Sequence, residues 1–395
     1  MSRYSHPIRE RAKIAARIWL STTLDKLRRP IRRRHILLVI GSACPEKVAQ
    51  IDERLRFLLS HLDEKFEVSK VSAASAFDCF RNSAVATADP GAISGFARQR
   101  LRWVADLDYE TNPLDAWALI GIGEALVHGP DRRILETARQ TFTAHVHSLR
   151  GEGAKPAYLF GTGPSLHLAS QRSFSDGHTI VCNTIVRDRE LWHHLNPVFF
   201  TAGDAIYHFG HNAHARAFRA DAIRRLEESA GRALFVYPAT FDVVVRSQFK
   251  AVESLLVPIP RGVDSSFHTD IAVDLTKRFS LPPLGNVLVD QLLPLGCTLS
   301  RDIRLWGFDG RAPRDSGFWA NSSAQSYPEL MQSMRDAHPA FYSNAVPKGN
   351  EVQYVKNVHG DQLEDRLAHA EMRGFTFETL HPSWTPTLQK RYRGI

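Results

Sequence analysis

A glycine-containing turn at residues 161–166 has residue types that suit phosphate binding. Its six residues are Gly161, Thr162, Gly163, Pro164, Ser165 and Leu166, and they follow the apolar residues 157–160. Glycines let a backbone turn tightly, and proline suits the first position of a helix, whose free N–H groups attract an anion. The turn is neither a Walker A motif nor the full dinucleotide fingerprint, since Leu166 stands at the third glycine position. A tight turn without a ligand is the alternative.

Polar residues also follow three later apolar runs. They are Asn183 after residues 179–182, Asp204 after 198–201, and Asp309 after 303–307. Open α/β sheets bind ligands at the carboxyl ends of their strands. We therefore expect Asn183 to hydrogen-bond a base or phosphate, Asp309 to bind a ribose or orient a catalytic group, and Asp204 to line the same crevice. The alternative for Asp309 is a cap on the following turn.

These residues require a sheet whose strands end on one side. The second half of the chain alternates short apolar runs with helical stretches, which is typical of a mostly parallel sheet. The predicted strands are residues 157–160, 179–182, 198–201, 233–237, 303–307 and 375–380, and the predicted helices include 213–229, 287–295 and 363–372. The fold class is therefore α/β, with a Rossmann-like, mostly parallel sheet flanked by helices.

The sequence predicts three parts. Residues 35–40 and 66–71 read as strands around an amphipathic helix, and a mostly helical pattern follows from 93 to 150. Residues 151–156 contain two glycines and a proline and read as a linker. We therefore expect a basic arm at 1–35, an N-terminal α/β and helical lobe at 36–150, and the Rossmann-like domain at 151–395.

Basic residues are concentrated in the arm. The chain has a formal charge of +8, whereas residues 1–35 alone hold eleven Lys or Arg against two acidic residues, a charge of +9. The remainder is therefore at −1, which argues against a nucleic-acid-binding surface on the main domain. Ile14, Ile18, Trp19 and Leu20 lie among the cations, so we expect attachment to an anionic membrane surface, with a solvated basic tail as the alternative.

Neither a transmembrane span nor a signal peptide is expected. The longest apolar stretch, residues 116–127, is interrupted by Glu124 and is shorter than the roughly 20 residues that cross a bilayer. The four cysteines lie far apart among apolar or small residues, which indicates buried, reduced thiols. We expect a cytoplasmic protein, peripheral at the inner membrane.

Several of these motifs together resemble one enzyme family. The motifs are Gly-x-Gly-Pro-Ser-Leu at 161–166, Val-Cys-Asn at 181–183, Gly-Asn-Val at 285–287, Leu-Gly at 295–296, Gly-Phe-Asp at 307–309 and Val-His-Gly-Asp at 358–361. Their order over about residues 155–385 is similar to the bacterial sialyltransferases that modify lipooligosaccharide and capsule, and to uncharacterised surface-polysaccharide glycosyltransferases. The chain departs from that pattern at Thr162, Arg311 and Pro283-Leu284.

The resemblance implies a GT-A-like, metal-independent, inverting glycosyltransferase. It would move sialic acid, or another nonulosonate or Kdo-like sugar, from a CMP donor to a surface polysaccharide or glycolipid, with no cofactor. His359 is then the candidate general base, because a histidine titrates near neutrality, and Asp309 is the second catalytic candidate. The expected nucleotide-sugar-binding residues are Gly161, Thr162, Gly163, Pro164, Ser165, Asn183, Asp204, Gly285, Asn286, Gly307, Arg311 and Trp319.

Alternatives remain open at several positions. His359 also suits a surface or helix-capping role, and the segment that carries Trp319 and Tyr327 suits either a lid or an ordinary loop. The spacing His208-x-x-His211-x-x-His214 lacks a carboxylate or cysteine, so solvated histidines are favoured over a zinc site. Asp106-x-Asp108 matches a metal-binding D-x-D, but its predicted position is in a helical region away from strand ends. We expect no metal.

Two other functions compete with glycosyl transfer. One is a nucleotide-dependent pyrophosphokinase or phosphotransferase on the same fold, which the lack of a convincing metal-binding carboxylate pair disfavours. The other is a non-catalytic nucleotide-binding component of a glycan assembly complex. The sequence leaves the sugar, the acceptor and homo-oligomerisation undecided.

Overall fold

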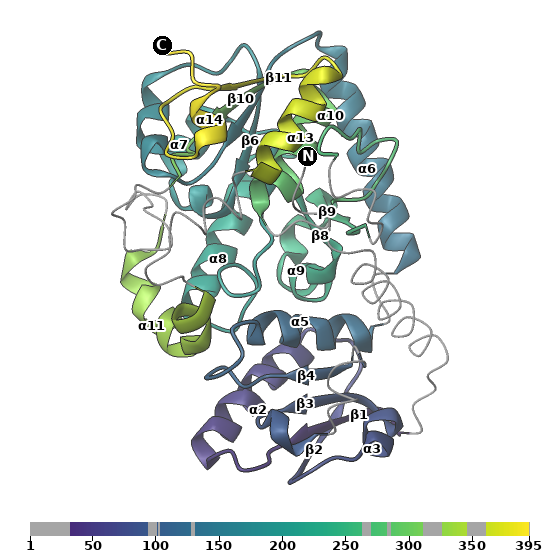
Figure 1. Ribbon diagram of the computed structural model, residues 1–395. Helices are drawn as coiled ribbons and strands as arrows, with labels where there is room; N and C mark the ends of the chain where they lie inside the picture. The colour runs from purple at the N-terminus through teal and green to yellow at the C-terminus, as the bar shows by residue number, and fades with distance from the viewer. Residues whose placement is uncertain are drawn as a thin grey trace. The chain divides into compact units, whose positions relative to one another are not determined.

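A computed structural model shows two compact units (Figure 1). The structure describes residues 32–93, 101, 103–127, 131–262, 270–282, 286–310, 326–345 and 361–394. The first unit comprises Met1–Gly129 and His338–Ser343, and the second comprises Pro130–Ala337 and Asn344–Ile395. Among the described residues, no helix has both the length and the apolar character needed to cross a bilayer.

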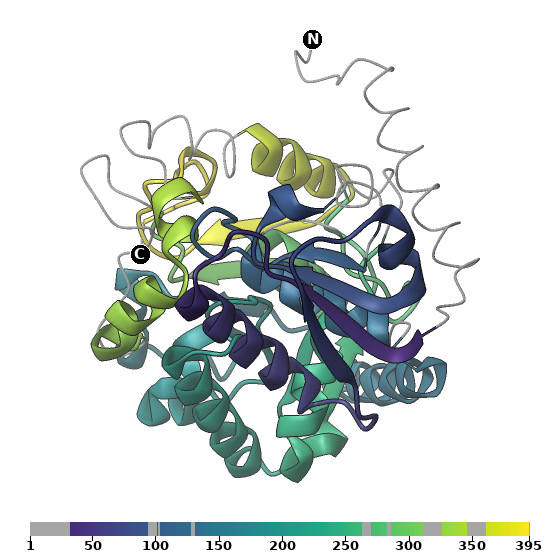
Figure 2. The same cartoon turned by 90° about the horizontal axis from the view of Figure 1, so that it is seen from below.

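The first unit is built on a four-stranded parallel sheet. Its strands are β1 (Arg32–Val39), β2 (Glu67–Val71), β3 (Asn82–Thr87) and β4 (Val104–Asp106), in the order β2-β1-β3-β4. Its helices are α2 (Pro45–Leu59), α3 (Ala76–Arg81), η1 (Pro90–Ala92) and α5 (Asp115–Leu126). The helix α2 lies alongside the sheet (Figure 2) and packs against α5, which covers β3 and β4. The expected β-α-β start is confirmed, whereas β3 and β4 were not predicted because they are short runs of small residues.

The second unit is built on a seven-stranded parallel sheet. Its strands are β5 (Ala157–Phe160), β6 (His178–Cys182), β7 (Phe199–Thr201), β8 (Leu234–Pro238), β9 (Leu256–Ile259), β10 (Asp302–Trp306) and β11 (Thr376–Thr379). Their order is β11-β10-β5-β6-β7-β8-β9. All six predicted strands occur, and the seventh strand, β9, was not predicted. The predicted Rossmann-like α/β class is therefore confirmed.

Helices cover both faces of this sheet. They are α6 (Arg132–Gly151), η2 (Pro164–Gln171), η3 (Asn183–Arg187), α7 (Arg189–Leu195), α8 (Ala213–Glu228), η4 (Ala239–Phe241), α9 (Asp242–Gln248), η5 (Lys250–Leu255), the π-helix η7 (Leu288–Leu292) leading into α10 (Leu293–Leu299), η8 (Pro328–Leu330), α11 (Met331–Ala337), α13 (Asp361–Met372) and α14 (Pro386–Gln389). A further π-helix, η9 (Phe341–Ala345), lies largely in the segment assigned to the first unit. The helix that begins at Pro164, within the glycine-containing turn, is the 3₁₀ helix η2.

Alternate residues of each central strand bury opposite faces of the sheet. Leu159 and Phe199 join the core that includes Phe142 and Val146 of α6, whereas Phe200 contacts Trp192 of α7 on the other face at 5.8 Å between ring centroids. Such two-sided burial explains why these strands read as continuous apolar runs. Because α6 is part of this core, the division between the units falls at Gly129, before the linker expected at 151–156.

The direction of chain winding reverses beside β5. The chain runs from β5 outward through β6, β7, β8 and β9, then returns to place β10 on the opposite side of β5. The connections that follow β5 and β10 therefore lead to strands on opposite sides of this pair, β6 and β11. This topological switch point is where open α/β sheets bind their ligands.

Candidate functional site

The turn after β5 is fastened to the loop after β10. The Gly161 N–H donates to the Trp306 carbonyl at 2.8 Å, and the Gly163 N–H donates to the Gly307 carbonyl at 2.8 Å. A Cβ on Gly163 would lie 2.2 Å from Asp309 Oδ2, and one on Gly161 would lie 2.6 Å from the Gly307 carbonyl oxygen. The two glycines are therefore required by the packing of these loops before any ligand is considered.

Asp309 lies at the start of η2 rather than out in solvent. Its Oδ1 accepts a hydrogen bond from the Ser165 N–H at 2.9 Å, and its Oδ2 accepts one from the Ser165 hydroxyl at 2.9 Å. This carboxylate thus caps the N-terminus of η2, where the sequence predicts that a phosphate binds. The N–H and hydroxyl of Ser165 are therefore already bound by a carboxylate and do not stand free for a ligand phosphate.

His381 is a residue of this site that the sequence analysis missed. Its Nε2 accepts hydrogen bonds from the N–H groups of Gly307 at 2.8 Å and Phe308 at 3.2 Å, and its Nδ1 lies 2.8 Å from the Pro382 carbonyl. An acceptor Nε2 and a donor Nδ1 require the neutral ring with its proton on Nδ1. His381 therefore positions the β10 loop. The position of His381 directly after a predicted strand, like that of Asp309, is the sequence feature that could have identified it.

Asn183 has an unsatisfied polar atom at the end of β6. Its backbone is left-handed, with φ +52°, and its buried Oδ1 has no hydrogen-bond partner among the described residues. The register that pairs Phe160 with Val181 brings the chain out of β5 and β6 side by side, so Thr162 and Asn183 leave the sheet as neighbours. An unpaired buried amide oxygen costs about 1–3 kcal/mol. A ligand N–H or O–H at this position would recover that free energy.

Two other predicted site residues support local turns. The Oδ1 of Asp204 accepts hydrogen bonds from the N–H groups of Ile206 and Tyr207, both at 2.7 Å. The Oδ1 of Asn286 accepts one from the Leu288 N–H at 2.8 Å, in the turn that leads into the π-helix η7. Asp204 remains at the carboxyl edge of β7, but one of its oxygens is committed to the backbone.

Four predicted residues, Gly285, Arg311, Trp319 and His359, lie outside the described residues, so the structure does not test them. Tyr327 is described and is 3% exposed. Its hydroxyl donates to Asp221 of α8 at 2.6 Å, and the Arg187 guanidinium lies 4.9 Å from its ring centroid. Tyr327 therefore packs against α8, as the ordinary-loop alternative expects of this residue.

The histidines at 208 and 214 have structural partners. Burial lowers the pKa of His208 well below 6.5, with His214 and Arg219 adding to the effect. His208 Nδ1 accepts from the Asp204 N–H at 3.2 Å, and His214 Nδ1 lies 3.0 Å from the Tyr207 carbonyl. In the part of the chain that the structure describes, no group of three or more His, Cys, Asp or Glu side chains is placed to hold a metal ion.

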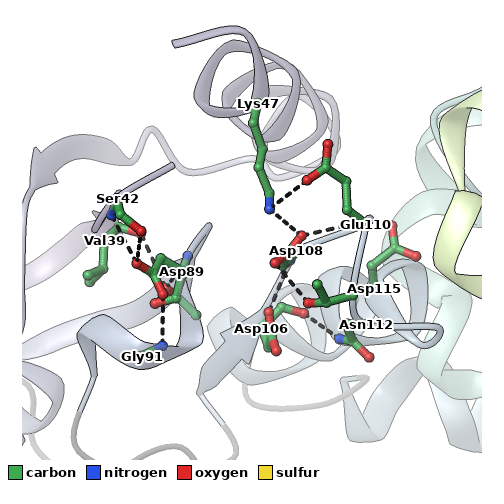
Figure 3. Close-up of polar contacts among 12 residues, drawn as sticks. Val39, Ser42, Lys47, Asp89, Gly91, Asp106, Asp108, Glu110, Asn112 and Asp115 are labelled. Carbon is green, nitrogen blue, oxygen red and sulfur yellow. Dashed lines mark hydrogen bonds and ion pairs between the residues drawn. The ribbon is translucent and has the colours of Figure 1, made fainter. Parts of the chain in front are cut away.

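The D-x-D pair is in a different place from the one expected. Asp106 is the last residue of β4, so the prediction that the pair lies away from strand ends is wrong. Asp108 is buried and pairs with Lys47 Nζ at 2.5 Å, while its Oδ2 accepts from the Thr111 hydroxyl at 2.8 Å (Figure 3). The Asp108 carboxylate is thus already neutralised by a lysine.

The first unit repeats the loop contact seen in the second. Asp89 follows β3, and its Oδ2 accepts from both the N–H (2.9 Å) and the hydroxyl (2.8 Å) of Ser42, which follows β1 (Figure 3). Gly41 has φ +54°, and a Cβ on it would lie 2.3 Å from Asp89 Oδ2. In both units an aspartate beyond a neighbouring strand therefore binds the serine beyond the first strand.

A polar cavity lies at the opposite, amino edge of the seven-stranded sheet. Its volume is about 480 Å³, and it is lined by residues that include His145, His178, Lys155 and Arg232. Burial is the main cause of lowered pKa values at both His145 and His178. None of the residues predicted to bind the nucleotide-sugar lines this cavity.

No family model, curated protein or solved structure matches this chain. The function must therefore be argued from the residues at the carboxyl edge of the sheet.

Proposed function

We propose that the second unit is a glycosyltransferase that binds a CMP-activated acidic sugar at the carboxyl edge of β5, β6 and β10. The observation that carries the proposal is the unpaired, buried Oδ1 of Asn183 beside the glycine turn at a topological switch point. The acceptor is proposed to be a bacterial surface polysaccharide or glycolipid, in keeping with the motif order noted above.

Cytosine is a suitable partner for Asn183. The free atom is a hydrogen-bond acceptor, and the exocyclic amine of cytosine is a donor of the kind it requires. Uracil also carries a donor, its ring N3–H, so the Asn183 oxygen by itself does not separate the two pyrimidine bases. A site with a buried polar group discriminates strongly against a ligand that lacks the matching group. The side-chain chemistry thus suits the base of a CMP donor, and the nucleotide panel separates CMP from UDP.

The proposed reaction is an inverting displacement with His359 as general base. The base removes the proton from the acceptor hydroxyl as its oxygen attacks the anomeric carbon, and CMP departs with the electrons of the glycosidic bond. A positioned base of this kind contributes about 10²–10⁴-fold. Asp309 is assigned a positioning role through Ser165, because both of its oxygens accept hydrogen bonds from that residue.

A thermal-shift panel of CMP, CDP, UDP, GDP and ATP tests the nucleotide directly. We expect CMP to raise Tm, and Asn183→Gly, which tolerates the left-handed backbone, to weaken CMP binding about 5–15-fold through loss of one hydrogen bond. Asn196→Gly is the matched control, because Asn196 is also left-handed, with φ +48°, but ends α7 at the amino edge. A shift with ATP and magnesium but not with CMP would instead favour the phosphotransferase alternative.

Catalysis is tested separately from binding. CMP release from CMP-N-acetylneuraminic acid should be lost in His359→Ala while CMP still raises Tm. Full turnover by that variant would show that another group is the base. Binding of CMP without turnover across a panel of CMP-sugar donors would favour the non-catalytic alternative.

We further propose that residues 1–31 attach the enzyme to an anionic membrane surface. Each Lys or Arg near such a surface contributes about 1 kcal/mol. Deletion of residues 1–31 leaves β1, which begins at Arg32, intact. The deletion should abolish co-sedimentation with phosphatidylglycerol vesicles and leave donor hydrolysis unchanged, with phosphatidylcholine vesicles as the control. If the full chain and the chain that lacks residues 1–31 bind the anionic vesicles equally, the membrane role is refuted.

A further inference from the structure

The loop after β11 is held rigidly against the loop after β10. His381 Nε2 accepts from the Gly307 N–H at 2.8 Å, the Ser383 hydroxyl donates to the Phe308 carbonyl at 2.7 Å, and the Trp384 N–H donates to the Asp309 carbonyl at 2.6 Å. Three successive residues of the β10 loop are thus each bound by the β11 loop. The backbone of Trp384 is thereby fixed beside Asp309, at the switch point.

The side chain of Trp384 is nevertheless open to solvent. It is 60% exposed, although tryptophan is among the side chains with most to gain from burial. On the other side of the site, the apolar residues that follow β7, Ala205, Ile206 and Phe209, are fully buried. An exposed apolar ring is therefore available in the loop after β11, whose backbone is hydrogen-bonded to the β10 loop.

We propose that Trp384 is a stacking platform for a pyranose ring of the acceptor glycan. The inference rests on the proposed function. That proposal puts the nucleotide over β5 and β6, so Asp309, which follows β10, lies between the nucleotide and Trp384 in the strand order. A transferase must hold the attacking hydroxyl within about 3–3.5 Å of the reacting carbon. The acceptor therefore lies next to the donor along the same edge, and of the residues described after β11, Trp384 carries the exposed aromatic ring.

The chemistry of an indole face suits a sugar ring. The face carries partial negative charge, and the axial C–H bonds of a pyranose carry partial positive charge, so the two surfaces attract while apolar area leaves water. The hydroxyl groups at the sugar's edge stay free to hydrogen-bond or react. An open-chain polyol has the same hydroxyl groups but lacks the flat C–H face, so it should not bind there.

Indole N–H resonances of the ¹⁵N-labelled full chain test this contact without any need for turnover. The chain has seven tryptophans, and loss of one resonance in Trp384→Phe assigns the relevant signal. With CMP present, methyl β-D-galactopyranoside, methyl β-D-glucopyranoside or methyl N-acetyl-β-D-glucosaminide should shift that signal saturably, and mannitol should not. No shift with any of the three pyranosides, or an equal shift with mannitol, would overturn the proposal.

Kinetics with lactose as acceptor and CMP-N-acetylneuraminic acid as donor supply the second test. Trp384→Ala should raise the acceptor KM by about 10-fold, with kcat and CMP affinity unchanged, and Trp384→Phe should recover part of the loss. Met372→Ala is the matched control, because Met372 is 80% exposed on α13.

Weakened CMP binding in Trp384→Ala would overturn the acceptor assignment. If the unmodified protein binds no CMP, the proposed function fails, and the pyranoside titration without nucleotide still decides the role of Trp384.

Discussion

Gly163→Ala separates the structural role of the glycine turn from its role in ligand binding. The backbone of Gly163 has φ −68° and ψ 167°, which alanine adopts without strain. The new Cβ would nevertheless lie 2.2 Å from Asp309 Oδ2 and 2.7 Å from the Gly307 carbonyl oxygen. Neither distance is compatible with van der Waals radii, so the Asp309 carboxylate must move or the two loops must separate.

The expected loss follows from the hydrogen bonds that this movement breaks. Displacing Asp309 removes two bonds from Ser165, each 2.9 Å long and each made to a charged acceptor. Bonds of that kind contribute about 1.5–3 kcal/mol each, and partial replacement by water lowers the sum. We therefore expect Gly163→Ala to reduce the free energy of unfolding by about 2–5 kcal/mol, which corresponds to a fall in Tm on the order of 10 °C.

Urea and thermal unfolding of the ligand-free protein provide the measurement, followed by circular dichroism. Gly151→Ala is the matched control, because Gly151 ends α6 in the same unit and a Cβ there meets nothing within 4 Å. That control should change stability by less than about 1 kcal/mol. If Gly163→Ala is as stable as Gly151→Ala, the packing argument is refuted, and the glycine must serve the approach of a ligand.

Three further predictions concern stability. Ser165→Ala and Asp309→Asn should each destabilise, and their effects should be non-additive by at least 0.5 kcal/mol in a double-mutant cycle, because both remove or weaken the bond from the Ser165 hydroxyl to Asp309 Oδ2; additive effects would contradict the contact. Asp115→Ala should cost about 3–5 kcal/mol in urea unfolding, since it removes the buried carboxylate that lies 2.6 Å from the Arg54 guanidinium and 2.9 Å from His338 Nδ1; a loss below about 1 kcal/mol would contradict this. Burial lowers the pKa of His208 well below 6.5, so as the pH falls the unfolded chain binds a proton at this residue before the folded protein does. The free energy of unfolding should therefore decrease as the pH drops below about 6.5, and His208→Gln should reduce that dependence on pH.

The sheet of the second unit was predictable because its strands are buried on both faces. Continuous apolar runs such as Ala157–Phe160 mark such strands, and polar or glycine residues mark their ends, so six of the strands could be read from local pattern. By contrast, β4 has only three residues, and its end at Asp106 follows from pairing with β3 across a long sequence separation. Local periodicity carries no information about such pairing, so the D-x-D residues were assigned to the wrong kind of element.

The sequence by itself determined that a glycine turn, Asn183 and Asp309 each follow a strand of an α/β sheet. Only the tertiary structure decided what each one contacts, because strand order is a long-range property: β10 lies beside β5 although β6 to β9 come between them in the chain. That adjacency turns Asp309 toward Ser165 and brings His381 and Trp384 to the same edge. Only the structure shows that the buried Asn183 oxygen has no partner within the described part of the chain, which is the feature that points to a ligand.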